Sequence, residues 1–287
     1  MPLVDTIETF QMTNVGTHID GTDVYQGNRN LLDNPFFTIR QRGDGSFTGN
    51  VYGVDRWRGG NSRTTITGAS GYITLSTNSS GNGLFRQVLS QTYEGTYTFS
   101  AKVRGTGSGA IFFQDSGGTF IGTTTEFSLN NETKIVTNTF TTSGTAIGGV
   151  GFRADTSNSY DILCAKLEQG SVSTLANDAP PDYGTELAKC RYYFRRIKAS
   201  AAANVLIGAT TSTTAAVFVV PGEMYVNTGT ISKSGTITAN TKSVTAVSQV
   251  QSSEGITITA TSSGLTANNG AVLNFASGAY IDISHDL

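Results

Sequence analysis

Six of the carboxylates between residues 33 and 161 are candidates for supporting catalysis. A glycosidase needs two carboxyl groups roughly 5–10 Å apart, one on each side of the bond that it cleaves. The sequence does not show which of these side chains meet. It also has no H-E-x-x-H motif, no G-x-S-x-G motif and no Cys–His arrangement. We therefore predict a protein that is not an enzyme. The six are Asp33, Asp44, Asp55, Glu126, Glu132 and Asp161.

Trp57 is the single tryptophan, and Arg56 and Arg58 flank it. Sugars bind through contacts with aromatic faces and through hydrogen bonds from planar polar groups, so these three residues could form a glycan platform. The alternative is a packing role, because a large aromatic side chain buries much apolar area. Arg56, Trp57 and Arg58 are therefore the candidate glycan-binding site, and a packing role for Trp57 is the alternative.

The residue types offer few ligands for a metal ion or a cofactor. The chain has two His and two Cys, too few for a Cys-rich zinc site. Asp33, Asn34 and Asp161 could offer oxygen ligands to one Ca²⁺, but no dense D-x-D-x-D-G loop accompanies them. We predict no metal and no cofactor, and this calcium alternative stays open. Cys164 and Cys190 are predicted to be unbridged, buried thiols.

The composition indicates which elements must position these residues. Charged residues make up 14% of the 287-residue chain, Gly occurs 34 times, and the net charge is −2. This balance lacks the basic footprint of a nucleic-acid binder. Abundant Thr and Gly favour strands and turns over helices, so we predict an all-β protein. The longest apolar stretch, residues 215–220, is far too short to cross a membrane, and we expect neither membrane insertion nor a secretory signal.

Alternating apolar and polar residues predict the strands of a first domain over residues 31–170. In 96–104 the odd positions are apolar and the even positions are polar, which is typical of a strand with one buried face. Phe112 and Phe113 are adjacent, so only one of them can face the core. The other must meet a second sheet, a partner or solvent. Several short strands at this spacing favour a jelly-roll sandwich. The remaining predicted strands are 71–76, 84–89, 110–114, 133–140, 147–153 and 160–167.

Three other regions complete the predicted organisation. Residues 1–30 show no sustained period and are predicted to be an extended arm that orders against a partner. Residues 171–190 form a Pro-containing linker and a short helix, which Thr185 could cap. Residues 191–287 form a second small β-sandwich of low charge, whose faces an oligomer would bury.

Seven segments together resemble bacteriophage tail-fibre and related virion appendage proteins, which often carry a jelly roll similar to carbohydrate-binding modules. Their order and spacing carry the resemblance, which covers roughly residues 28–200. The resemblance implies an oligomeric structural protein that often touches a host glycan. The segments are NLLDNPFF (30–37), VDRW (54–57), LFRQVLSQ (84–91), GTYTFSAKVRG (95–105), AKLEQG (165–170), YGTELAKCRYYFRR (183–196) and YIDISHDL (280–287).

The expected function is therefore a non-enzymatic virion protein: a tail fibre, a baseplate appendage or a head fibre that contacts host-surface polysaccharide. We expect a homotrimer, made in the host cytoplasm, that docks on other virion proteins through its arm. The docking anchors would be Leu3, Val4, Ile7, Phe10 and Val15. The alternative is a secreted or phage-borne carbohydrate-active enzyme or accessory carbohydrate-binding module.

Overall fold

The computed structural model describes residues 16–19, 22–25, 28–69, 71–222, 224, 229–252 and 255–286. Over these residues the secondary structure is almost entirely β, which confirms the predicted fold class. The described helices are α1 (Tyr183–Tyr193) and the 3₁₀ helix η1 (Leu175–Asn177).

The chain divides into two compact units. Unit 1 comprises the described residues up to Phe36 together with Thr48–Asn50 and Gly59–Pro180. Unit 2 comprises Phe37–Phe47, Val51–Arg58 and the described residues from Pro181 onward. Two short segments from the first fifth of the chain thus group with the C-terminal half, a division that the sequence pattern did not predict.

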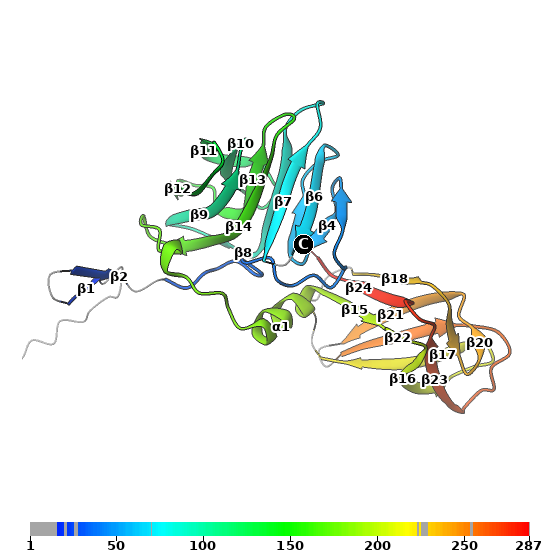
Figure 1. Ribbon diagram of the computed structural model, residues 1–287. Coiled ribbons are helices and arrows are strands. Elements are labelled where there is room, and N and C mark those ends of the chain that lie inside the picture. The colour runs from blue at the N-terminus through cyan, green and yellow to red at the C-terminus, as the bar shows by residue number, and fades with distance from the viewer. Residues whose placement is uncertain are drawn as a thin grey trace, which may run out of the picture. The chain divides into compact units, whose positions relative to one another are not determined.

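Unit 1 is a sandwich of two antiparallel sheets, whose layers Figure 1 shows. Its strands follow the order β11-β10-β13-β8 in one sheet and β12-β9-β14-β7-β6 in the other. They are β6 (Thr64–Ala69), β7 (Tyr72–Thr77), β8 (Gly83–Tyr93), β9 (Thr96–Gly105), β10 (Ser108–Gln114), β11 (Phe120–Ser128), β12 (Glu132–Thr141), β13 (Ile147–Ala154) and β14 (Ser159–Gln169).

Strand β9 shows how the period-two pattern builds the core of unit 1. The ring of Phe99 lies 6.3 Å from that of Phe113 and 5.4 Å from that of Phe152, both on the opposite sheet. The even positions Thr98 and Ser100 were expected to face solvent, but they are buried. Thr98 donates a hydrogen bond to the Gly170 carbonyl, because the segment that follows β14 folds back over this sheet.

Helix α1 begins earlier than the sequence suggested. The N-cap is Asp182, whose side chain accepts a hydrogen bond from the Thr185 backbone N–H at 2.8 Å. Thr185 is therefore the donor to the cap rather than the cap itself. The helix begins earlier because the Asp182 carboxylate can accept hydrogen bonds from the amide groups of the first turn. Accepting these hydrogen bonds lowers the pKa of Asp182.

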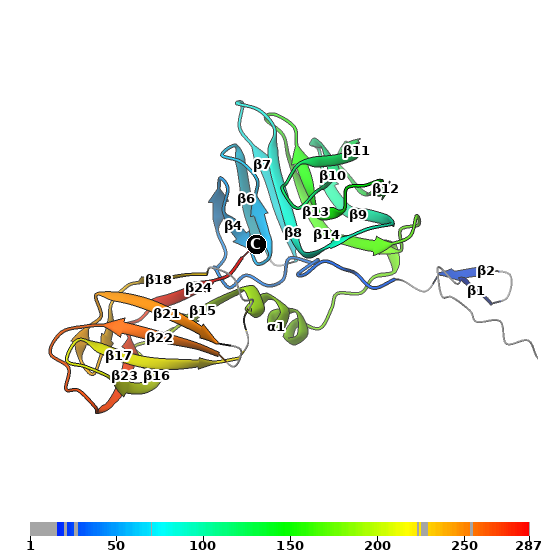
Figure 2. The same ribbon diagram turned by 180° about the vertical axis from the view of Figure 1, so that it is seen from behind.

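Unit 2 is a second sandwich, visible from behind in Figure 2. Its sheets have the strand orders β15-β24-β18 and β20-β19-β23-β16-β17-β22-β21. Apolar side chains of both sheets, among them Phe218, Leu273 and Ile281, form its core. The strands are β15 (Phe194–Lys198), β16 (Ala203–Thr210), β17 (Ala215–Pro221), β18 (Thr230–Ser234), β19 (Ile237–Ala239), β20 (Lys242–Ser243), β21 (Ala246–Ser252), β22 (Gly255–Thr261), β23 (Gly270–Phe275) and β24 (Tyr280–Ser284).

The remaining strands are short. β1 (Gly16–Ile19) and β2 (Thr22–Tyr25) pair with each other antiparallel, where the sequence predicted an irregular arm. β3 (Ser46–Thr48), β4 (Tyr52–Val54) and β5 (Trp57–Gly59) follow, and β4 pairs with β5. Across the described part of the chain, no helix has the length and apolar character needed to cross a membrane.

Candidate functional site

The two adjacent phenylalanines of β10 face opposite sides of their sheet. Phe113 points into the sandwich, where its ring lies 6.3 Å from Phe99 and 5.6 Å from Phe140. Phe112 therefore lies on the outer face, as strand geometry requires. The sequence left open what this second ring meets, and the structure supplies the answer in Phe120.

Glycines on β13 make room for large side chains on this outer face. Phe112 is paired with Gly151, which is paired in turn with Arg86 on β8. A Cβ atom at Gly151 would lie 2.5 Å from the Phe112 ring, and one at Gly149 would lie 2.3 Å from the Gln114 amide nitrogen. The side chains of Phe112 and Gln114 thus lie across β13, which they could do only over glycine.

Phe120 stacks on Phe112 and forms the accessible aromatic surface. The two ring centroids are 4.3 Å apart, with 35° between the ring planes. Phe112 is 1% exposed, whereas Phe120 is 43% exposed. A β-bulge places the rings together, because the register between β10 and β11 shifts between Ile111 and Phe113. An exposed ring supported from beneath by a second ring is a rigid apolar platform.

Planar polar groups lie on the same face of the sheet. Arg86 donates a hydrogen bond from Nη1 to the Gln114 Oε1 at 3.2 Å. Two residues along β13 from Gly151, Arg153 pairs with Glu126 at 2.5 Å and with Asp155 at 3.1 Å. We call Phe112, Phe120, Arg86, Gln114 and Arg153 the platform face. An aromatic surface beside guanidinium and amide groups suits a sugar ring, which offers C–H groups on its faces and hydroxyl groups at its edge.

The same contacts argue against hydrolysis at the platform face. Glu126 and Asp155 are the two carboxylates that approach each other here, but the Nη2 atom of Arg153 lies between them. In a glycosidase the scissile bond occupies the space between the two carboxyl groups. The Arg153 guanidinium contacts both carboxylates and occupies that space.

Trp57 lies in the interior, and this corrects its use as a glycan platform. Trp57 is 0% exposed and packs edge-on against Phe37, with 5.3 Å between the ring centroids. Arg56 is 1% exposed, and its guanidinium lies 3.6 Å from the centroid of the Tyr193 ring. Arg58 is half-buried, with its guanidinium 5.8 Å from the Tyr52 ring. No ring face of Trp57 is open to a ligand, so we place no glycan on these three residues.

Asp161, one of the proposed calcium ligands, already has hydrogen-bond partners in the structure. Asp161 accepts hydrogen bonds from Thr74 at 2.7 Å and from Arg104 at 2.7 Å, so the oxygens of this one proposed calcium ligand are already engaged. Within the ranges that the structure describes, no group of three or more His, Cys, Asp or Glu residues could hold a metal ion. The docking residues lie outside the described residues; they are Leu3, Val4, Ile7, Phe10 and Val15.

The sequence pattern singled out Phe112 but missed Phe120, Arg86 and Arg153. A signal for Phe120 was present. The turn at residues 115–118 reverses the chain, and Phe120 then comes opposite Gln114 in the register. Because the two strands of a hairpin pair symmetrically about its turn, residues 112–114 are expected to lie beside Phe120.

Comparisons with known proteins give structural similarities alone. No protein-family model matches the chain, and no curated protein matches its sequence. The module BiXyn10A CBM1 is 17% identical with a TM-score of 0.36, over 50% of this chain and 100% of that one. A variant of the family 29 carbohydrate-binding module CBM29-2 is 12% identical with a TM-score of 0.35, over 49% and 99%.

A third similar structure is the CBM22-1 xylan-binding domain of Xyn10C from Paenibacillus barcinonensis. It is 8% identical with a TM-score of 0.33, over 52% of this chain and 99% of that one. TM-scores below 0.5 are too low to transfer a ligand or a binding site from these proteins to this chain.

Proposed function

We propose that this chain is a non-catalytic structural protein of a bacteriophage virion whose unit 1 contacts host-surface glycan. The observation that carries the glycan contact is the stacked pair of Phe112 and Phe120 beside Arg86 on the platform face. The virion assignment rests on the resemblance of the sequence segments to tail-fibre and appendage proteins. A tail fibre, a baseplate appendage and a head fibre all fit this role.

A binding experiment with a matched control tests the glycan contact. We expect Phe120→Ala to weaken binding to purified host-surface polysaccharide about tenfold, since it removes the exposed ring. Ile135→Ala is the control, because Ile135 is 40% exposed on the other sheet of unit 1. Affinity electrophoresis of both variants provides the measurement. Equal affinity for wild type and Phe120→Ala would remove the platform face as the contact.

The virion role needs a separate test, because an accessory carbohydrate-binding module would also bind glycan. Antibodies against the chain should label purified phage particles, and their position on the particle distinguishes a tail, baseplate or head location. A protein that binds glycan but never copurifies with particles would favour the accessory module.

We also propose that the chain is a homotrimer that buries an apolar row on the seven-stranded sheet of unit 2. Val219 and Val250 lie on the two sides of Thr257, opposite it in the register, and are 61% and 67% exposed. Ile207, on β16, is 82% exposed. β-branched side chains on an exposed sheet favour association, and identical faces can close around an axis.

Light scattering during size-exclusion chromatography tests the trimer. We expect a mass of three times 30.2 kDa for the wild type. The double variant Ile207→Ser and Val219→Ser should shift the protein toward the monomer, because each Ser removes an apolar contact. A wild-type monomer at micromolar concentration would overturn this part of the proposal.

Residues 1–28 are proposed to dock the protein on the virion through the apolar side chains predicted as anchors. A phage whose gene is knocked out can be complemented with a chain that lacks these residues. We expect the truncated protein to fold but to be missing from purified particles. Its normal incorporation would show that docking lies elsewhere.

A further inference from the structure

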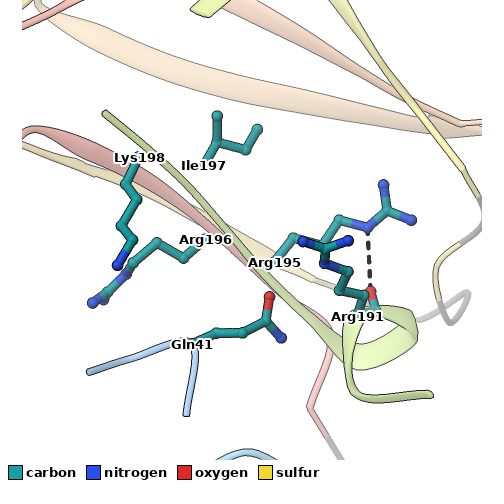
Figure 3. Close-up of a pocket in the computed structure, with 6 residues that line it drawn as sticks. All are labelled: Gln41, Arg191, Arg195, Arg196, Ile197 and Lys198. Atoms are coloured by element: carbon teal, nitrogen blue, oxygen red, sulfur yellow. Dashed lines mark hydrogen bonds between the residues drawn. The ribbon is translucent and has the colours of Figure 1, made fainter. Parts of the chain in front are cut away.

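Unit 2 contains a cavity of about 530 Å³ where α1 ends and β15 begins. Figure 3 shows how its side chains project from these two elements and from the segment that carries Gln41. Four of the six described lining residues are cationic, and none of the six is a carboxylate. The six residues are Gln41, Arg191, Arg195, Arg196, Ile197 and Lys198.

Arg196 is already committed to partners within unit 2. Arg196 donates two hydrogen bonds to the Asp282 carboxylate, at 2.7 and 2.6 Å, and its guanidinium lies 3.9 Å from the centroid of the Tyr280 ring. Its charge is therefore balanced, and its side chain is fixed as part of the wall.

Arg191 and Lys198 are exposed, and in the described ranges neither forms an ion pair with a carboxylate. Arg191 lies in the last turn of α1, and its backbone carbonyl accepts a hydrogen bond from the Arg195 Nε at 3.3 Å. This bond holds the side chain of Arg195 against the end of the helix, and Figure 3 shows the two guanidinium groups close together.

The proximity of these two arginines has an electrostatic cost. Burial lowers the pKa of Arg195, and the neighbouring charge of Arg191 lowers it further. An anion bound at Arg191 would offset the repulsion between these two charges. Guanidinium groups suit carboxylate and phosphate oxygens because they can bind two oxygens at once.

Gln41 adds a hydrogen-bond acceptor to this cationic wall. Its amide nitrogen donates to the Asp55 Oδ2 at 2.7 Å and to the Phe194 carbonyl at 2.7 Å. Both protons of the amide are thereby used, so the orientation of the amide group is fixed. Its oxygen can accept a hydrogen bond, and a hydroxyl group is the complementary donor.

We propose that this cavity binds an acidic saccharide, with carboxylate or phosphate groups at the exposed cations Arg191 and Lys198 and a hydroxyl group at Gln41. The cavity volume lies in the range of small-molecule sites and exceeds what one oxyanion fills. The assignment of the ligand as a saccharide rests on the glycan binding proposed above. The binding of an anion in the cavity does not depend on it. This site is separate from the platform face, which belongs to unit 1.

Calorimetric titration of the full-length protein tests the proposal with three probes. The probes are an oligosaccharide of hexuronic acids, a neutral hexose oligosaccharide of the same length, and inorganic phosphate. We expect the wild type to bind the acidic oligosaccharide and phosphate, with phosphate competing for the site. Binding should weaken as salt rises, because the contact is ionic.

Charge reversal at the two exposed cations gives the decisive comparison. The double variant Arg191→Glu and Lys198→Glu should lose at least about tenfold in affinity for the acidic oligosaccharide and for phosphate. Arg191→Gln with Lys198→Gln serves as a second pair if the reversal disturbs folding. Lys242→Glu is the control, since Lys242 is an exposed cation on β20 of the same unit. It should bind like the wild type.

Each outcome bears on one proposal. Wild-type protein that binds neither anionic probe, or an equal loss in Lys242→Glu, would overturn the site. Binding of phosphate without the acidic oligosaccharide would overturn the saccharide assignment. Phe120→Ala should keep its affinity for phosphate, since the platform face is not part of the cavity. If Phe120→Ala binds the polysaccharide as tightly as the wild type while the cavity variants lose affinity for phosphate, the oxyanion site stands and the platform proposal fails.

Discussion

The Lys166 Nζ lies 2.5 Å from the Asp178 Oδ1 although the Lys166 side chain is buried within unit 1. The same ammonium group donates to the Thr174 hydroxyl at 2.8 Å. Thr174 in turn donates from its backbone and its hydroxyl to the buried Glu168, both at 2.7 Å. This network attaches the segment around η1 to β14, so the predicted linker is in part an element of unit 1.

Replacing Lys166 with Met should lower the free energy of unfolding of unit 1 by about 3 kcal/mol. The change leaves Asp178 and Glu168 without the charge that offsets their burial. Lys102→Met, on the exposed side of β9, is the control and should change stability by less than about 0.5 kcal/mol. Urea denaturation of both variants measures the difference. Similar stability of the two variants would contradict this role for the network.

The raised pKa of Asp55 predicts that the stability of unit 2 depends on pH. Burial raises the pKa of Asp55 from 3.8 to about 6, against the opposing effects of Arg42 and of hydrogen bonds from Gln41. The folded protein therefore holds this proton more tightly than the unfolded chain. The free energy of unfolding should fall by about 2 kcal/mol as the pH rises from about 4 to about 6.

The variant Asp55→Asn isolates this contribution, because the amide does not titrate. The difference in unfolding free energy between wild type and Asp55→Asn should change by about 2 kcal/mol between pH 4 and pH 7. Asp44→Asn is the control, since the Asp44 side chain is 81% exposed. A difference that stays constant across this range would show that Asp55 titrates normally.

Gly151 should be indispensable to the platform face. A Cβ atom here would lie 2.5 Å from the Phe112 ring and 2.7 Å from the Phe85 carbonyl oxygen. Gly151→Ala should destabilise unit 1 by about 1–3 kcal/mol and weaken glycan binding, because Phe112 must move from beneath Phe120. Gly45→Ala is the control, since nothing lies within 4 Å of its Cβ position. Thermal unfolding and affinity electrophoresis measure the two effects.

The two cysteines should react only after unfolding. Both are buried thiols, and burial raises the pKa of Cys164, which disfavours the reactive thiolate. Mass spectrometry after alkylation without a reducing agent should find little modification in the native protein and two modified thiols in denaturant. A linked peptide that contains Cys164 and Cys190 would contradict this expectation.

The period-two pattern was sufficient to predict most strands of unit 1. Residues 96–104 alternate strictly, and β9 spans Thr96–Gly105. The pattern works because successive strand residues face opposite sides of a sheet, a property of the backbone alone. It could not predict that Thr98 and Ser100 are covered, since the covering segment begins some seventy residues later in the chain.

By itself, the sequence determined the all-β class and most strand positions of unit 1. These properties depend on composition and local alternation. The tertiary structure alone decided which aromatic ring is accessible: it buries Trp57 and exposes Phe120. It also decided which cations share a cavity, since Gln41 meets Arg191 and Arg195 from a segment about 150 residues away. Burial and long-range pairing depend on how the sheets stack, and the order of residues along the chain does not specify that stacking locally.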